Sequence, residues 1–239
     1  MPRPAFRGQL PLGSSPVRSS KDHLTPLTPV APAIYFREEL ERHMEFTDDG
    51  VVIDKPPSDL DRLVLDVAEI LERVDVRYAV VSGYVAVLFG RARATEDIDV
   101  IVERFDAATA SELATALNDA GYWGSAMPLD ELHETLTDDL PVRIAEQDHR
   151  VPNVELKFAS DEYDCASLDD PITVHLRDGS VRIGPLELQI AYKLDMGAQK
   201  DFEDALYLHE ILEANLNRRA LEAYVVKLGV EDEYERLRS

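Results

Sequence analysis

The stretch of the chain that decides the fold, residues 78–103, reads YAVVSGYVAVLFGRARATEDIDVIVE. It begins with the β-type run Tyr78–Val81 and continues through Ser82-Gly83 into small and apolar residues without turn signals, which predicts a helix over residues 83–90. It ends in Asp97–Glu103, where the alternation of Asp, Ile and Val is typical of a strand. We therefore expect a strand, a helix and a second strand around a Ser-Gly turn.

Two features of this unit point to phosphate chemistry. The first amides of a helix have no partner inside it, so the Ser82-Gly83 junction can hold a phosphate, and glycine lets the ligand approach the backbone. Asp97 and Asp99 are two apart on a strand, so both carboxylates point to one face. Neighbouring carboxylates repel unless a cation lies between them, and Mg²⁺ bridging triphosphate oxygens is the natural occupant.

The aspartate pair by itself is weak evidence in so acidic a chain. Asp and Glu make up 47 of 239 residues, so about nine acid–x–acid pairs should occur by chance. The pair gains weight from its surroundings, which are the apolar residues 100–102 after it, the Ser-Gly turn before it, and Arg91 and Arg93 between them.

The rest of the chain predicts an α+β fold, a small mixed sheet flanked by helices and followed by a helical C-terminal portion. A helix is expected after the capping pair Ser58 and Asp61. The other predicted elements are helices over 106–120 and 129–140, strands over 142–145, 153–158, 172–176 and 181–183, and three helices over 186–228.

The first part of the chain differs in composition from the rest. Residues 1–43 hold six of the 25 basic and four of the 47 acidic residues, which leaves 19 basic and 43 acidic residues for the remainder. We interpret 1–43 as a disordered or non-native N-terminal extension, with Met44 as the natural start; the alternative is a basic tail that binds a partner. We expect 44–185 to form the α/β domain and 186–239 to be a helical portion packed on it.

The net charge of −22 is spread along the chain. This charge fits a halophilic protein, because concentrated salt screens the repulsion, although a merely acidic protein is the alternative. It argues against strong non-specific nucleic-acid binding. We find no signal peptide and no membrane-spanning run, and the single Cys165, which we expect to be buried, excludes an intrachain disulfide. We therefore expect a cytoplasmic protein.

The segments Val81-Ser82-Gly83, Phe89-Gly90-Arg91, Arg93 and Thr95–Asp99 resemble the nucleotidyltransferase superfamily with the polymerase-β-type fold. They are most similar to the small prokaryotic branch that includes abortive-infection and type IV toxin–antitoxin nucleotidyltransferases and their uncharacterised relatives. The resemblance covers residues 60–105 and extends more loosely to about 213.

This resemblance implies Mg²⁺-dependent transfer of a nucleoside monophosphate from a nucleoside triphosphate to an unknown acceptor, either transfer RNA, a protein or a small molecule. An alternative is a catalytically weak or inactive nucleotide-binding module of a toxin–antitoxin pair, with a cognate antitoxin or other partner protein. A structural protein that binds no nucleotide is the third possibility.

The resemblance also implies roles for single residues. Asp97 and Asp99 would bind two Mg²⁺ ions together with a third acid on a later strand, for which Glu155 is the candidate; a solvent-facing Glu155 or the use of Asp148 are the alternatives. Relatives place a small residue after the turn, so Tyr84 is expected either to crowd the phosphate site or to stack on a base.

A second match lies in the C-terminal helices. Residues 191–194 and 199–204 resemble the family's Lys-Leu and Lys-Asp-x-x-Asp segments, and they contain Lys193, Lys200, Asp201 and Asp204. The two lysines are expected to bind the nucleotide together with Ser82, Gly83, Arg91 and Arg93. The alternative is a solvated helix face with an ion pair, which would contribute little.

Overall fold

The computed structural model describes residues 43–239, and the predicted N-terminal extension falls, His43 aside, outside this range. The strands are β1 (Met44–Thr47), β2 (Gly50–Ile53), β3 (Tyr78–Val81), β4 (Asp97–Val102), β5 (Tyr122–Gly124), β6 (Val142–Glu146), β7 (Asn153–Phe158), β8 (Ile172–Leu176) and β9 (Gly179–Ile183). The helices are α2 (Asp59–Arg73), α3 (Gly83–Leu88), α4 (Ala107–Asp119), the 3-10 turn η1 (Leu129–Glu131), α5 (Leu132–Thr137), α6 (Glu162–Asp169), α7 (Leu186–Met196), α8 (Gln199–Leu212), α9 (Arg218–Leu228) and α10 (Glu231–Leu237).

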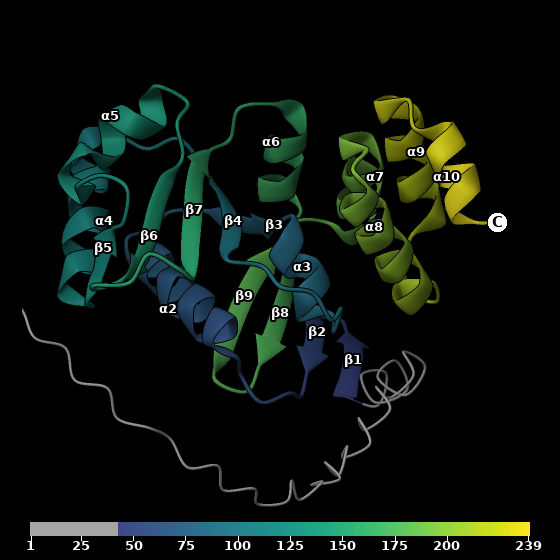
Figure 1. Ribbon diagram of the computed structural model, residues 1–239, viewed down its shortest axis with the longest axis horizontal. Helices are drawn as coiled ribbons and strands as arrows, with labels where there is room; N and C mark the ends of the chain where they lie inside the picture. The colour runs from purple at the N-terminus through teal and green to yellow at the C-terminus, as the bar shows by residue number, and fades with distance from the viewer. Residues whose placement is uncertain (1–42) are drawn as a thin grey trace, which may run out of the picture. The chain divides into compact units, whose positions relative to one another are not determined.

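The strands of residues 43–239 form one mixed sheet in the order β1-β2-β8-β9-β3-β4-β7-β6-β5 (Figure 1). β3 is antiparallel to β4, with Val81 opposite Asp99. β4 is parallel to β7, and this register pairs Asp97 with Asn153 and Asp99 with Glu155. Because side chains alternate between the faces of a strand, Asp97, Asp99 and Glu155 share one face of the sheet.

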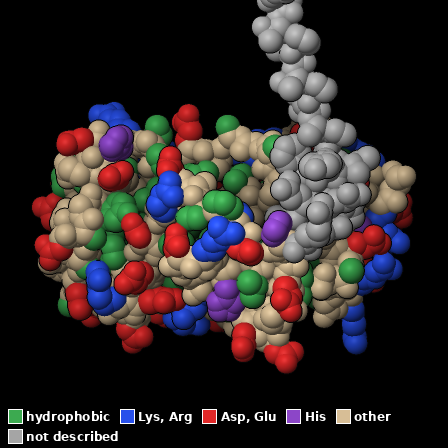
Figure 2. All heavy atoms as spheres, turned by 90° about the horizontal axis from the view of Figure 1, so that it is seen from below, with side chains coloured by type: hydrophobic (Ala, Val, Ile, Leu, Met, Phe, Trp, Pro, Cys, Tyr) green, Lys and Arg blue, Asp and Glu red, His purple; other side chains and the backbone are tan. Residues whose placement is uncertain are grey.

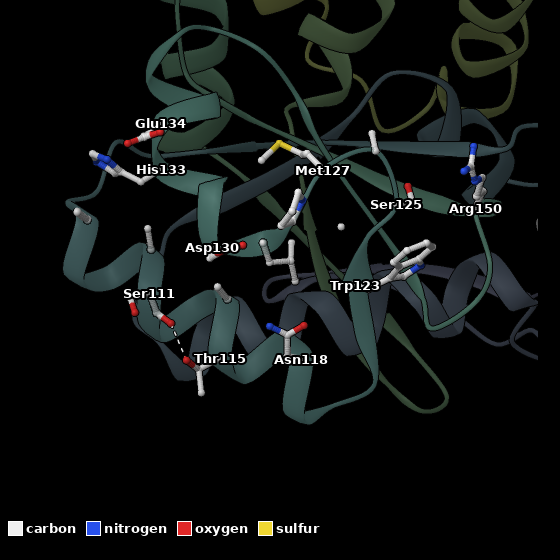
Figure 3. Close-up of a pocket in the computed structure, with 17 residues that line it drawn as sticks. Ser111, Thr115, Asn118, Trp123, Ser125, Met127, Asp130, His133, Glu134 and Arg150 are labelled. Carbon is white, nitrogen blue, oxygen red and sulfur yellow. Dashed lines mark hydrogen bonds between the residues drawn. The ribbon is translucent and has the colours of Figure 1, made fainter.

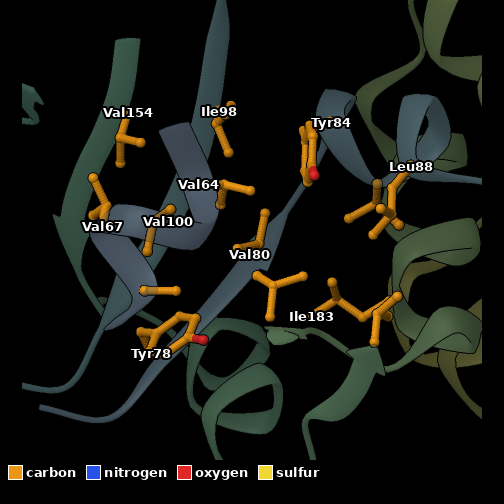
Figure 4. Packing of buried hydrophobic residues seen from close by; sticks show 14 of the residues in the cluster. Val64, Val67, Tyr78, Val80, Tyr84, Leu88, Ile98, Val100, Val154 and Ile183 are labelled. Atoms are coloured by element: carbon orange, nitrogen blue, oxygen red, sulfur yellow. The ribbon is translucent and has the colours of Figure 1, made fainter. Parts of the chain in front are cut away.

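The opposite face of these strands carries the main core. Val80, Val100 and Val154 are buried there against Val64 and Val67 of α2 (Figure 4). The amphipathic spacing of α2 provides this contact, because its apolar residues recur every three or four positions. The core therefore fixes which side chains of β4 and β7 point toward the other face.

The face that carries the carboxylates has a much smaller apolar cluster. Ala79, Val81 and Ile101 pack there against Leu168 of α6. The four helices α7–α10 follow the last strand and lie together at the end of the chain (Figure 1). The sheet, α6 and α7 thus surround the place where the predicted site residues lie.

The predicted fold class, a mixed sheet with helices followed by a helical portion, is confirmed. The predicted helix over 129–140 is η1 followed by α5. Five elements were not predicted individually, namely β1, β2, β5, α6 and α10. Cys165, expected to be buried, is exposed on α6.

Two further observations concern the charge of the surface and the length of the helices. Figure 2 shows acidic side chains spread over the face in view, with basic ones between them. Within residues 43–239, none of the helices combines the length and the apolar character that crossing a bilayer requires.

Candidate active site

The Ser82-Gly83 turn joins β3 to α3 in an unusual backbone conformation. Ser82 has φ 66° and ψ −132°, a region that favours glycine, so this serine is strained. Its amide donates a 2.9 Å hydrogen bond to Oε1 of Gln189 on α7. A Cβ added to Gly83 would lie 3.1 Å from Nη2 of Arg93, so the guanidinium covers the turn closely.

The predicted carboxylate pair lies next to this turn. Asp97 is exposed at the start of β4, and the Thr95 hydroxyl donates to its Oδ1 over 3.1 Å. Asp99 is partly buried, and burial raises the pKa of its carboxyl, with the charges of Asp97 and Glu155 adding to the effect. A hydrogen bond from the Ser82 side chain and the charge of Lys157 act in the opposite direction. The surroundings of Asp99 therefore disfavour its negative charge unless a cation is added.

The third predicted carboxylate has another partner. Glu155 faces the same side of the sheet as Asp99, but its Oε2 accepts a 3.0 Å hydrogen bond from Nε of Arg143, its neighbour on β6. Among residues 43–239, no group of three or more His, Cys, Asp or Glu side chains is arranged to hold a metal ion. The predicted three-carboxylate site is therefore not assembled. The alternative Asp148 is exposed in the turn between β6 and β7.

The remaining donors nevertheless fit one Mg²⁺ ion. Mg²⁺ is commonly bound by one or two carboxylates together with substrate phosphates and water, and Asp97 and Asp99 supply two carboxylates. Asn153, the register partner of Asp97, is buried, and its Oδ1 has no hydrogen-bond donor. A second ion held by Glu155 would require that side chain to leave Arg143.

A cavity of about 210 Å³ opens beside Asp99. Its floor comes from β3, β4 and β7, and its walls come from α6 and α7. Its lining comprises Val81, Ser82, Asp99, Ile101, Lys157, Tyr163, Asp164, Ser167, Leu188, Gln189, Tyr192, Lys193 and Met196. Three predicted site residues, Ser82, Asp99 and Lys193, thus meet at one cavity.

Sequence reasoning missed the helical wall of this cavity. Tyr163 of α6 and Tyr192 of α7 have ring centroids 6.0 Å apart, and Gln189 contacts the turn directly. Tyr192 precedes the predicted Lys193 and could have been noticed for that reason. The short helix α6 has almost no amphipathic pattern, so the sequence carried little signal for Tyr163.

Three of the predicted nucleotide-binding cations converge on Asp204 of α8. Nζ of Lys193 lies 2.9 Å from its Oδ2, Arg93 contacts the same oxygen, and Nε of Arg91 lies 2.5 Å from Oδ1. The last contact is an ion pair without hydrogen-bond alignment, because neither atom has a hydrogen-bond partner. Arg91 also pairs with Glu203 over 2.9 Å. The group keeps an excess of positive charge beside the turn.

The two predicted lysines, Lys193 and Lys200, lie in different surroundings. Lys193 is 1% exposed, so its ammonium is buried and held by Asp204 although its side chain lines the cavity. Lys200 is exposed in the first turn of α8 and does not line the cavity, whereas Asp201 beside it is buried. The structure therefore does not bring Lys200 to the site.

Both expectations for Tyr84 are wrong. Its side chain is fully buried in the core, and its hydroxyl donates a 2.7 Å hydrogen bond to Oδ1 of Asp61, so the ring neither crowds the turn nor stacks on a ligand (Figure 4). Burial raises the pKa of Tyr84 well above its usual range. Burial also opposes the charge of Asp61, but the Ser58 amide, Lys55 and Tyr84 outweigh it and lower the pKa of Asp61.

A second, larger cavity of about 820 Å³ lies between α4 and the segment from β5 to α5. Figure 3 shows Trp123 and Arg150 at one side of it and His133 and Glu134 at the other. None of the predicted site residues lines this cavity. Of these two cavities, the smaller one is therefore the one that predicted site residues line.

Comparisons with known proteins give a likeness to solved structures alone. No family model matches the chain, and no curated protein matches it. Among solved structures, the chain is similar to an antigenic nucleotidyltransferase-like protein from Paracoccidioides brasiliensis, with a TM-score of 0.49 and 18% sequence identity. That similarity covers 77% of this chain and 95% of the other.

Proposed function

We propose that this chain transfers a nucleoside monophosphate from a nucleoside triphosphate to an acceptor hydroxyl in a Mg²⁺-dependent reaction. The observation that carries the proposal is the position of Asp99. Its carboxylate shares a sheet face with that of Asp97, and it also lines the cavity that Ser82 and Lys193 border. A carboxylate pair of which one member lines a cavity next to clustered cations suits a metal-bound triphosphate.

The proposed roles follow from the placement of each side chain. Asp97 and Asp99 would hold Mg²⁺, which would supply charge neutralisation for the triphosphate. Ser82 and the Gly83 amide would hold the outer phosphates, and the positive excess of Arg91, Arg93 and Lys193 would stabilise the leaving pyrophosphate. The acceptor hydroxyl would lose its proton to water, and its oxygen would bond to the α-phosphorus as the bond to pyrophosphate breaks.

The choice of which phosphate carries the label makes the test specific for nucleotidyl transfer. The protein is incubated with triphosphates labelled on the α-phosphate, Mg²⁺, high salt and either transfer RNA or lysate protein. Nucleotidyl transfer moves this label to the acceptor, whereas label on the γ-phosphate stays with pyrophosphate. The double variant Asp97→Ala/Asp99→Ala should abolish transfer, and the exposed Asp119→Ala should not. Absence of transfer, or transfer that survives the double variant, would sink the proposal.

A second candidate is a nucleotide-binding module without turnover, acting in a toxin–antitoxin pair. Two ion pairs favour it: Arg143 holds Glu155, and Asp204 holds Lys193. Both pairs occupy side chains that a reaction would use. Calorimetric binding of Mg²⁺–triphosphate without label transfer would support this candidate over the enzyme.

A further inference from the structure

We propose that Gln189 is a positioning residue that holds the Ser82-Gly83 turn in its phosphate-binding conformation. This inference rests on the proposed function, and it assigns to α7 a role beyond supplying Lys193. The carrying observation is the 2.9 Å hydrogen bond from the Ser82 amide to Oε1 of Gln189.

The turn needs an external contact to keep its shape. Ser82 adopts φ 66° and ψ −132°, a conformation that side-chain-bearing residues rarely adopt. Such strain persists only where the surrounding structure holds the residue in place. No side-chain cap satisfies the start of α3. The Ser82 side chain bonds to Asp99 on β4, and the hydrogen bond from the Ser82 amide to Gln189 ties the strained backbone itself to α7.

The Gln189 side chain is itself fixed in the structure. It is 5% exposed, and its Nε2 lies so close to the backbone of Gly184 that a Cβ added there would approach it to 2.6 Å. The same Cβ would lie 2.9 Å from Oγ of Ser167. Any side chain at position 184 would therefore force the amide of Gln189 or the hydroxyl of Ser167 to move.

Glutamine also suits the electrostatics of this position. Its oxygen accepts the hydrogen bond from the Ser82 amide without adding charge to the cavity that Asp99 also lines. A glutamate would place another negative charge in that cavity. Gln189 and Lys193 are four residues apart and line the same cavity, so one face of α7 contacts both the turn and the Asp204 ion pairs.

The test is a double-mutant cycle with glycine at position 82. Gln189→Met keeps the size of the side chain and removes the acceptor oxygen, and Ser82→Gly relieves the backbone strain. Affinity for Mg²⁺–ATP, GTP, CTP and UTP is measured by calorimetry on the full chain, and exchange of the Ser82 amide is measured by NMR. Gln147→Met, in an exposed turn, is the matched control.

We expect Gln189→Met to weaken binding by about tenfold, the factor that loss of roughly one hydrogen bond gives. It should also speed exchange of the Ser82 amide, while in the Ser82→Gly background the loss should fall to about twofold. Gly184→Ala should weaken binding and speed exchange as Gln189→Met does, although it leaves residue 189 unchanged. Gln147→Met should bind as the wild type does.

Unchanged affinity in a folded Gln189→Met protein, or an equal loss in both backgrounds, would overturn the inference. Folding is checked from the thermal midpoint of each variant. If the wild type binds none of the four triphosphates, the proposed function fails as well. That outcome differs from failure of Gln189 alone, in which the wild type binds and the variant binds equally well.

Discussion

Lys193 and Asp204 form an ion pair of 2.9 Å in which both side chains are almost fully buried. Arg91 and Arg93 approach the same carboxylate from the loop between α3 and β4. One acid on α8 therefore organises cations from two other parts of the chain. Asp204 therefore contributes to the stability of the protein and also holds the cations that we propose to bind phosphate.

Substitutions of Asp204 and Lys193 should lower the free energy of unfolding by unequal amounts. Asp204→Asn leaves the buried Lys193 and the partly buried Arg93 without a counter-charge and leaves Arg91 with Glu203 alone, so we expect a loss of about 3–5 kcal/mol in the free energy of unfolding. Lys193→Met leaves Asp204 paired with two arginines and should cost clearly less. Urea unfolding of both variants measures the difference. Equal losses would show that Asp204 does not organise the cluster.

Asp99→Asn should stabilise the protein while removing its response to Mg²⁺. Burial raises the pKa of the Asp99 carboxyl, so its contribution to stability is complete below the unfolded-state pKa and is lost as pH rises through the folded-state pKa. The gain from the asparagine should therefore be larger at pH 7 than at pH 4. A gain of up to about 1 kcal/mol corresponds to a rise in Tm of about 2–4 °C.

Thermal unfolding with and without Mg²⁺ checks this prediction. Mg²⁺ should raise the Tm of the wild type, because an ion that binds only the folded state stabilises it, and should leave Asp99→Asn unchanged. A stabilisation by Mg²⁺ that persists in Asp99→Asn would place the ion elsewhere.

Tyr84→Phe should lower stability without affecting ligand binding. The change removes the 2.7 Å hydrogen bond to the buried Asp61, which keeps its contacts with Lys55 and Ser58. We expect a loss of about 1–3 kcal/mol, since a hydrogen bond to a charged buried group is lost. Urea unfolding measures the loss, and calorimetry with Mg²⁺–triphosphate serves as the control. A tenfold drop in affinity would show that Tyr84 acts in the site.

Salt should stabilise the protein over a wide range. The net charge of −22 is dispersed, and the screening length falls from about 10 Å at 0.1 M to about 3 Å at 1 M salt. We expect the Tm to rise steadily from 0.1 to 2 M KCl. A Tm that falls over this range would argue against the halophilic interpretation.

The local part of this site was predictable from the sequence. The strand, turn and helix around Ser82 and the alternation through Asp97 and Asp99 are short-range patterns, and the structure has these elements where the sequence predicts them. The partners of these elements come from far along the chain. Gln189 contacts Ser82 across 107 residues, and Asp204 contacts Arg93 across 111.

Contacts between residues so far apart in the sequence have no counterpart in its local periodicity. Tyr84 shows how far a local pattern can be interpreted. Its position directly after the turn predicted a place beside the ligand, but α3 packs on the core and the Tyr84 hydroxyl contacts Asp61. Glu155 lies on the predicted strand and face, but its pairing with Arg143 depends on which strand lies beside β7.

The most direct test of the central claim is calorimetric titration of the wild type with nucleoside triphosphates, with and without Mg²⁺. We predict binding of a triphosphate that requires Mg²⁺, its loss in Asp97→Asn and Asp99→Asn, and its retention in the exposed Asp119→Asn. Binding that is equally tight without Mg²⁺, or unchanged in both aspartate variants, would contradict the assignment of Asp97 and Asp99 as the metal-binding pair.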